Sequence, residues 1–164
     1  MARYFIGTFA TIENYKSLKY EFGNTFKGKW VKEKDLHIAL KFLGEVKNPD
    51  LVIEKLKKIN YPKKQIIVFK RLKLFKKKIL SLRSSNKTLY KLQNKIEESL
   101  QGDFQKEKNF KPHITIMRVK RIKDIEYKEK FKTLDTSAKI KLKMCLIESK
   151  LDKDGVRYKI VREF

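Results

Sequence analysis

Apolar and polar residues follow two periodicities along this chain, and together they predict a mixed fold of strands and helices. Strand-like patterns occur at residues 3–9, 36–43, 65–75, 79–83, 110–119, 138–151 and 156–161. Helical spacing and capping residues predict helices at 12–26, 48–59, 86–100 and 124–134. No stretch rich in glycine, serine or proline divides the chain, so we expect one domain over residues 1–164.

The order of these predicted elements repeats. Strand, helix, histidine-containing strand, helix and strand occur in residues 3–75 and again in 79–151, before a closing strand at 156–162. His37 and His113 hold equivalent places in the two halves, 76 positions apart. We therefore expect two similar lobes, with the two histidine strands facing each other across a cleft.

His37 and His113 are the only histidines in the chain. Histidine both accepts and donates a proton near neutral pH, so a facing pair could run acid–base chemistry on a phosphate. A single histidine is more often structural, bonded to the backbone. The repeat favours the catalytic interpretation, because it gives both histidines the same strand context.

In the first histidine strand, alternation predicts that His37, Ala39 and Lys41 share the cleft face. The opposite, core face is expected to hold Ile38, Leu40 and Phe42.

In the second strand, His113 and Thr115 are expected to share the cleft face. The Thr115 hydroxyl can donate to a phosphate oxygen. Arg118 has the wrong parity for that face, unless a bulge near Met117 turns it into the cleft. Arginine in that place would suit bidentate phosphate binding.

The net charge of the chain indicates what kind of molecule it could bind. Lys and Arg number 42 against 19 Asp and Glu, a net charge of +23. Such a field favours nucleic acid, although lysines spread over the whole surface could equally serve solubility.

Other features narrow the setting. The one cysteine, Cys145, sits among apolar residues and predicts a buried thiol in a reducing, cytoplasmic environment. No apolar run is long enough for a membrane span, and the N-terminus lacks a signal-peptide layout. Neither a metal-ligand cluster nor a glycine-rich nucleotide loop is present, so we expect no metal and no cofactor.

The chain resembles the 2H phosphoesterases, and among them the LigT-like RNA 2',3'-cyclic phosphodiesterases. The resemblance rests on RYFIG at 3–7, WVKEKDLHIALKFLGEV at 30–46, FKPHITIMRV at 110–119, LIESKL at 146–151 and GVRY at 155–158. It implies an α+β fold of two pseudo-symmetric lobes, with antiparallel sheets flanking a central cleft and helices outside.

The resemblance also implies a reaction and roles for the site residues. The substrate would be RNA ending in a 2',3'-cyclic phosphate, including tRNA fragments, hydrolysed by a monomer to a 2'-phosphate. His113 would act as general base and His37 as general acid, while Thr115 and Arg118 bind the phosphate oxygens.

Two positions depart from the family pattern. Ala39 stands where the family has threonine, which removes one hydrogen bond to the phosphate, and Lys41 could supply charge in compensation. Leu82 stands where the family often carries a tryptophan near the middle strand. Phe9 and Phe75 are candidates for stacking the terminal base, although the apolar strand pattern around each favours a core position.

Three alternatives remain open from the sequence. The same residues could join RNA ends through a 2',5' linkage, with a 5'-hydroxyl in place of water. The loss of the threonine at position 39 would also fit a protein that binds RNA ends without turnover. A basic domain that contacts nucleic acid through charge alone is disfavoured by the paired histidines.

Overall fold

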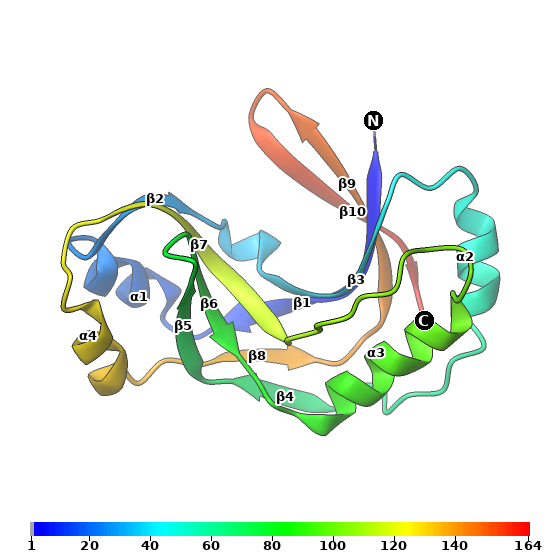
Figure 1. Ribbon diagram of the computed structural model, residues 1–164, viewed down its shortest axis with the longest axis horizontal. Coiled ribbons are helices and arrows are strands. Elements are labelled where there is room, and N and C mark those ends of the chain that lie inside the picture. The colour runs from blue at the N-terminus through cyan, green and yellow to red at the C-terminus, as the bar shows by residue number, and fades with distance from the viewer. Residues whose placement is uncertain (1) are drawn as a thin grey trace.

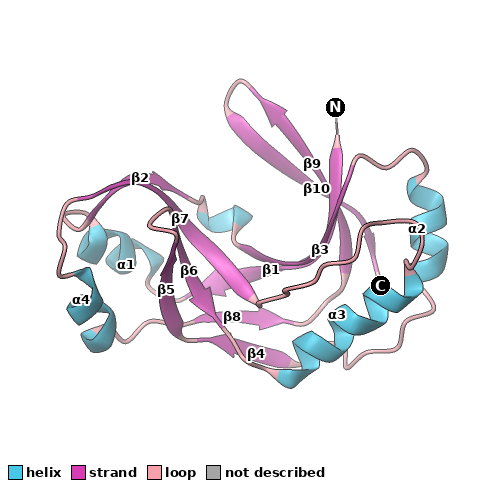
Figure 2. Cartoon of the chain, viewed as in Figure 1, coloured by secondary structure: helices cyan, strands magenta, loops and turns pink. Residues whose placement is uncertain are grey.

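The strands form one ten-stranded antiparallel sheet whose two halves meet at the histidine strands, with helices at both ends of the molecule (Figures 1 and 2). The computed structural model describes residues 2–164. The strands are β1 (Arg3–Ile12), β2 (Phe26–Trp30), β3 (His37–Gly44), β4 (Ile66–Phe69), β5 (Arg71–Phe75), β6 (Ile79–Arg83), β7 (His113–Ile122), β8 (Ala138–Lys141), β9 (Cys145–Asp152) and β10 (Gly155–Glu163). The helices are α1 (Tyr15–Phe22), α2 (Pro49–Leu56), α3 (Lys87–Ser99) and α4 (Tyr127–Thr133), with a 3-10 turn at Glu33–Asp35.

The strands form two lobes. The first lobe has the strand order β10-β9-β1-β3, and the second has β5-β6-β7 with β2 on the other side of β7. The lobes touch where β3 and β7 pair, at Ile38 opposite Ile114. Behind this contact, the end of β1 pairs with β8, which pairs in turn with β4. The expected α+β fold with antiparallel sheets around a cleft is confirmed.

Each lobe receives a helix from the other half of the chain. Helix α1 follows β1 of the first lobe, yet Phe22 packs edge-on against Phe131 of α4, beside the second lobe. Helix α3 follows β6 of the second lobe, yet it lies beside α2 and β3 of the first (Figure 1). The chain therefore crosses between the lobes twice, at equivalent points of the repeat.

Capping residues explain where two of the helices begin. The side chain of Asn48 accepts a hydrogen bond from the Asp50 amide at 3.2 Å, and Pro49 takes the first helical position. The side chain of Asn86 accepts from the Thr88 amide at 2.8 Å. These polar signals are local in the sequence, so both helices could be predicted from it.

Some predicted boundaries were wrong. The segment 12–26 is a short helix, α1, because β1 runs on to Ile12 and Phe26 opens the unpredicted strand β2. Strand β2 pairs with β7, so a tertiary contact and not its own sequence makes it a strand. The segment 65–75 is two strands, β4 and β5, which join different partners, β8 and β6.

The core lies under both histidine strands. Ile38, Ile114 and Ile116 are fully buried, and Leu40 is almost so. Cys145 is buried as expected, and burial raises the pKa of its thiol to about 11, so the reactive thiolate is scarce at neutral pH. Between residues 2 and 164, no helix has the length and apolar character needed to cross a membrane.

Candidate active site

A cavity of about 250 Å³ lies between the histidine strands. Strand β3 contributes His37, Ala39 and Phe42 to its lining. Strand β7 contributes His113, Thr115 and Arg118. The remaining walls come from the end of β2, the segment after it, and the hairpin between β9 and β10. The structure thus brings five of the six expected site residues into one cavity, and the exception is Lys41.

Strand register explains why the histidines share this cavity. Ile38 and Ile114 pair across the antiparallel contact and both point into the core. Their neighbours therefore point the other way, into the cavity. In this register His37 lies across from Thr115, and His113 lies across from Ala39.

A β-bulge in each histidine strand completes the lining. Relative to its neighbour, β3 has an extra residue at Leu40 and β7 has one at Ile116. An extra residue reverses the alternation beyond it. The bulge in β7 therefore turns Arg118 into the cavity, as the sequence analysis allowed. Phe42 enters it at the equivalent position, so the expectation that Phe42 is a core residue was wrong: its side chain is 70% exposed.

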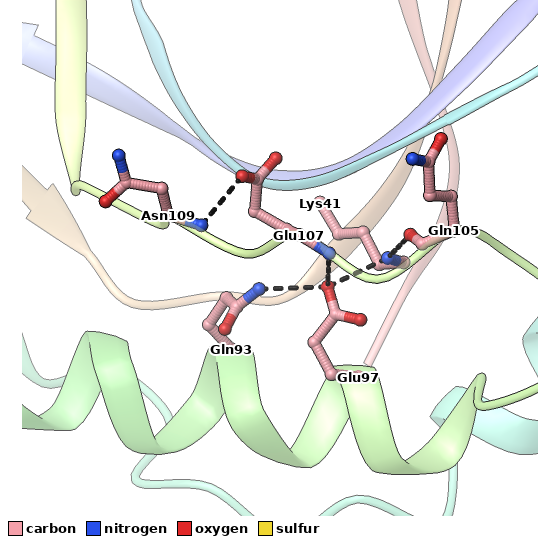
Figure 3. A network of polar contacts seen from close by, with 6 residues as sticks. All are labelled: Lys41, Gln93, Glu97, Gln105, Glu107 and Asn109. Atoms are coloured by element: carbon pink, nitrogen blue, oxygen red, sulfur yellow. Dashed lines mark hydrogen bonds and ion pairs between the residues drawn. The ribbon is translucent and has the colours of Figure 1, made fainter.

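The same bulge turns Lys41 away from the cavity, so its predicted place beside His37 was wrong. Lys41 is 4% exposed, and its Nζ lies 2.8 Å from Oε1 of Glu97 on α3 (Figure 3). It also donates to the carbonyl of Gln105 at 2.8 Å. The Glu97 carboxylate accepts further hydrogen bonds from Gln93 Nε2 and the Glu107 amide. Lys41 therefore ties β3 to α3 and to the loop before β7.

Both imidazole rings are held in the same way. Nδ1 of His37 lies 2.7 Å from the carbonyl of Asp35, and Nδ1 of His113 lies 2.7 Å from the carbonyl of Lys111. A carbonyl only accepts, so each Nδ1 carries a proton. Each Nε2 is then the nitrogen that can exchange a proton with a ligand.

His37 lies among aromatic rings. Its ring centroid is 4.9 Å from that of Phe5, 6.2 Å from Phe9 and 5.0 Å from Tyr158. Burial lowers the pKa of His37 below its ordinary 6.5, and the electrostatic interactions with His113 and Arg118 act in the same direction. The hydrogen bond to the Asp35 carbonyl opposes this change. Burial thus favours the neutral form of the His37 ring in the free protein.

Sequence reasoning gave no site role to three aromatic residues that line the cavity: Trp30, Phe42 and Tyr158. All three fall inside the segments that carried the family resemblance, which was the available signal. Of the two candidates for base stacking, Phe9 packs beside His37 and Phe75 is 42% exposed on β5. Leu82, at the position of the family's tryptophan, is fully buried.

The chemistry of the site follows from the groups that line it. In residues 2–164, no three His, Cys, Asp or Glu side chains are grouped so as to hold a metal ion. The cavity instead combines two imidazoles, a hydroxyl and a guanidinium, which are groups suited to binding and protonating a phosphate ester.

A cavity built from paired histidine strands of two similar lobes defines the two-histidine class of phosphoesterases. Residues 9–148 match the model of the 2'-5' RNA ligase superfamily. The chain belongs to this superfamily, the 2H phosphoesterases.

Relatives with curated names are similar over nearly their whole length. An RNA 2',3'-cyclic phosphodiesterase of Methanocaldococcus jannaschii is 31% identical, over 93% of this chain and 94% of its own. A protein of the same name from Aquifex aeolicus is 29% identical, over 100% of this chain and 97% of its own.

Solved structures share the fold. E. coli LigT complexed with 3'-AMP superposes with a TM-score of 0.76 at 20% identity, covering 99% of this chain and 96% of that one. A Thermus thermophilus protein, TT0787, gives a TM-score of 0.71 at 20% identity, covering 99% of this chain and 96% of that one.

Proposed function

We propose that this protein hydrolyses the 2',3'-cyclic phosphate at the end of an RNA strand and leaves a 2'-phosphate. The observation that carries the proposal is the matched pair of histidines, each anchored through Nδ1 and each lining one cavity with Thr115 and Arg118. The names of the relatives from M. jannaschii and A. aeolicus support RNA with such an end as the substrate.

In the proposed reaction, a water oxygen attacks the phosphorus atom and the bond from phosphorus to the ribose 3'-oxygen breaks. Nε2 of His113 accepts the proton from the water. Nε2 of His37 donates a proton to the departing 3'-oxygen. The Thr115 hydroxyl and the Arg118 guanidinium bind the non-bridging oxygens and stabilise the charge of the transition state. Because the imidazoles supply both acid and base, the reaction needs no bound metal.

For His37 to act as the general acid, binding of the substrate must protonate the His37 ring. Burial favours the neutral ring in the free protein, as its lowered pKa indicates. The negative charge of a bound phosphate favours the imidazolium form and raises the pKa again. Substrate binding would thus favour protonation of His37, which then donates this proton to the leaving oxygen.

The first test is incubation of the protein with a nucleoside 2',3'-cyclic phosphate in EDTA. We expect turnover to a 2'-phosphate, and a loss of at least about a hundredfold in His37→Ala and in His113→Ala, the usual scale of acid–base catalysis. Tight binding without turnover would support an RNA-end binder instead. Full activity in either variant would remove that histidine from the mechanism.

A second substrate separates the two roles. A nucleoside 2'-(4-nitrophenyl phosphate) has a leaving group that needs no proton, so it bypasses the general acid. His37→Ala should hydrolyse this substrate nearly as well as the wild type, whereas His113→Ala should not. The reverse result would exchange the roles of the two histidines.

Ligation is the second candidate, favoured by the match to the 2'-5' RNA ligase superfamily. In this reaction a ribose 5'-hydroxyl replaces water and the same two histidines move the protons. RNA fragments with cyclic phosphate and 5'-hydroxyl ends test it. A 2',5'-linked product that forms faster than the 2'-phosphate would make joining the main activity.

A further inference from the structure

A buried arginine lies next to the cavity without an anionic partner. Arg83 ends β6 and pairs directly with His113 of β7. Residues paired across two antiparallel strands point to the same face of the sheet. Arg83 is therefore on the face that carries His113, one strand farther from the centre of the cleft, and it does not line the cavity itself.

The surroundings of Arg83 leave its charge uncompensated. The side chain is 8% exposed, and its Nε has no hydrogen-bond partner. Among the described residues 2–164 it forms no ion pair, and its cation–π contact is with the Phe75 ring, whose centroid is 5.9 Å from Cζ. A guanidinium whose buried Nε has no partner costs free energy, so its place beside the cavity fits a ligand that supplies the opposite charge.

The basic surface continues beyond Arg83. On β5, Arg71 pairs with Arg83, and Lys73 pairs with Ser81, which itself pairs with Thr115. These side chains are thus on the same face as the phosphate-binding residues. Arg71 is exposed, and its positive charge adds to burial in lowering the pKa of Arg83. Two arginines that face each other across neighbouring strands repel unless an anion lies between them.

We propose that Arg83 binds the phosphate that links the terminal nucleotide of the RNA to the nucleotide before it. Arg71 and Lys73 then follow the strand outward over β6 and β5. The terminal phosphate is already served by Thr115 and Arg118 inside the cavity. Arg83 lies one strand spacing, about 4.8 Å, from His113, its pairing partner on β7. The proposal rests on the proposed function for the identity of the RNA end, and adds that the substrate is an oligonucleotide.

A second basic surface could guide the RNA strand out of the cleft by a route that does not pass Arg83. Phe42 lines both the cavity and a neighbouring groove, whose other wall includes Lys106 and Lys108. Both lysines are exposed and lie on the loop that Lys41 and Glu97 hold in place. An RNA strand that left the cleft by this groove would not meet Arg83, so the two paths can be separated by mutation.

The experiment compares a nucleoside 2',3'-cyclic phosphate with a trinucleotide that ends in the same group. We expect Arg83→Met to lower kcat/KM for the trinucleotide by about 10- to 100-fold, the effect of losing a charge-assisted hydrogen bond, and to leave the mononucleotide within about twofold. Arg162→Met, on the exposed end of β10, removes the same charge and should leave both substrates unchanged.

Stability provides the readout that a structural role would not give. Arg83→Met removes an unpaired buried charge, so its Tm should equal or exceed that of the wild type while trinucleotide turnover falls. A lower Tm with proportionate losses on both substrates would make Arg83 a structural residue and overturn the proposal.

Three other results are informative. Equal losses on both substrates at unchanged Tm would assign Arg83 to the terminal phosphate and overturn the proposal. Loss of trinucleotide turnover in Lys106→Gln/Lys108→Gln, with Arg83→Met unaffected, would direct the strand along the groove and also overturn it. If the wild type hydrolyses neither substrate, the proposed function fails, and the affinity of wild type and Arg83→Met for a trinucleotide 2'-phosphate still decides the role of Arg83.

Discussion

At the scale of single residues, His37 and His113 share a hydrogen-bonding pattern but not their surroundings. Each ring is fixed by a carbonyl two residues earlier. Only His37 has aromatic ring contacts, with Phe5, Phe9 and Tyr158, among the residues that the structure describes. The equivalent places in the repeat therefore carry imidazoles in different surroundings, as expected of a pair with different roles.

The lowered pKa of His37 predicts how stability depends on pH. Below the ordinary value of 6.5 the unfolded chain takes up the proton before the folded protein does, so the free energy of unfolding decreases as pH falls. Thermal melts between pH 7.5 and 5 should show a larger loss of Tm in the wild type than in His37→Asn, which lacks this group. Parallel curves for the two proteins would mean that the folded state does not disfavour the charged ring.

Replacement of Ala39 by threonine is expected to improve phosphate binding or turnover. It lines the cavity across from His113, at the place that Thr115 occupies in the other half of the repeat. Ala39→Thr should add a hydrogen bond to a charged phosphate oxygen and raise phosphate affinity or kcat/KM by about tenfold, as a net gain of about 1.5 kcal/mol allows. Ala39→Val has nearly the same shape without the hydroxyl, and serves as the control. No gain over this control would show that the site has adapted to alanine.

Substitution of Lys41 is expected to lower the stability of the fold and not the affinity for phosphate. Its charge and that of Glu97 are both buried, with side chains 2% and 8% exposed. Lys41→Met strands the Glu97 carboxylate and should cost about 3–5 kcal/mol of unfolding free energy. Urea titration measures this loss, and the double variant Lys41→Met/Glu97→Leu should recover most of it. An undiminished stability in the single variant would mean that water reaches the carboxylate.

At the scale of the elements, the sequence predicts the histidine strands but not their bulges. Alternation holds from His37 to Ala39 and from His113 to Thr115, so these four residues could be assigned to one face. The extra residues at Leu40 and Ile116 follow from pairing with β1 and β6. Such pairing is invisible in the local pattern. For this reason Phe42 and Lys41 were assigned to the wrong faces.

The helices with polar caps could likewise be predicted, because their signals are local. Strand β2 and the division of β4 from β5 could not, because each depends on partners distant in the sequence. The positions of α1 and α3 in the opposite lobes also depend on contacts distant in the sequence, so they could not be predicted either. The sequence thus indicated the residues of the site better than the walls around them.

The close approach of β2 to β7 predicts a sensitive glycine. A Cβ on Gly28 would lie 2.1 Å from the carbonyl oxygen of Arg118, which forces the strands apart. Gly28→Ala should cost about 1–3 kcal/mol of stability, the usual cost of overpacking, and should lower kcat/KM by displacing Arg118. Gly23→Ala is the control, since that residue has helical dihedrals and meets no atom closer than 3.4 Å. Equal behaviour of the two variants would show that β2 shifts freely.

At the scale of the whole molecule, the net charge of +23 predicts how salt acts on the two kinds of substrate. Affinity for a long single-stranded RNA should fall steeply with salt, because each neutralised phosphate releases counterions. Turnover of a mononucleotide cyclic phosphate should fall less, since it engages one phosphate. Titration of both with potassium chloride measures the two slopes. Equal slopes would assign the charge to solubility.

The exchange of α1 and α3 between the lobes has a thermodynamic consequence. Neither lobe contains the helix that follows its own first strand, so neither half of the chain, 3–75 or 79–151, holds the contacts of a complete lobe. Melting one lobe would strip a helix from the other and expose its apolar face. We therefore expect unfolding to be a single cooperative transition, in which the cleft between the lobes shares in the stability of the entire chain.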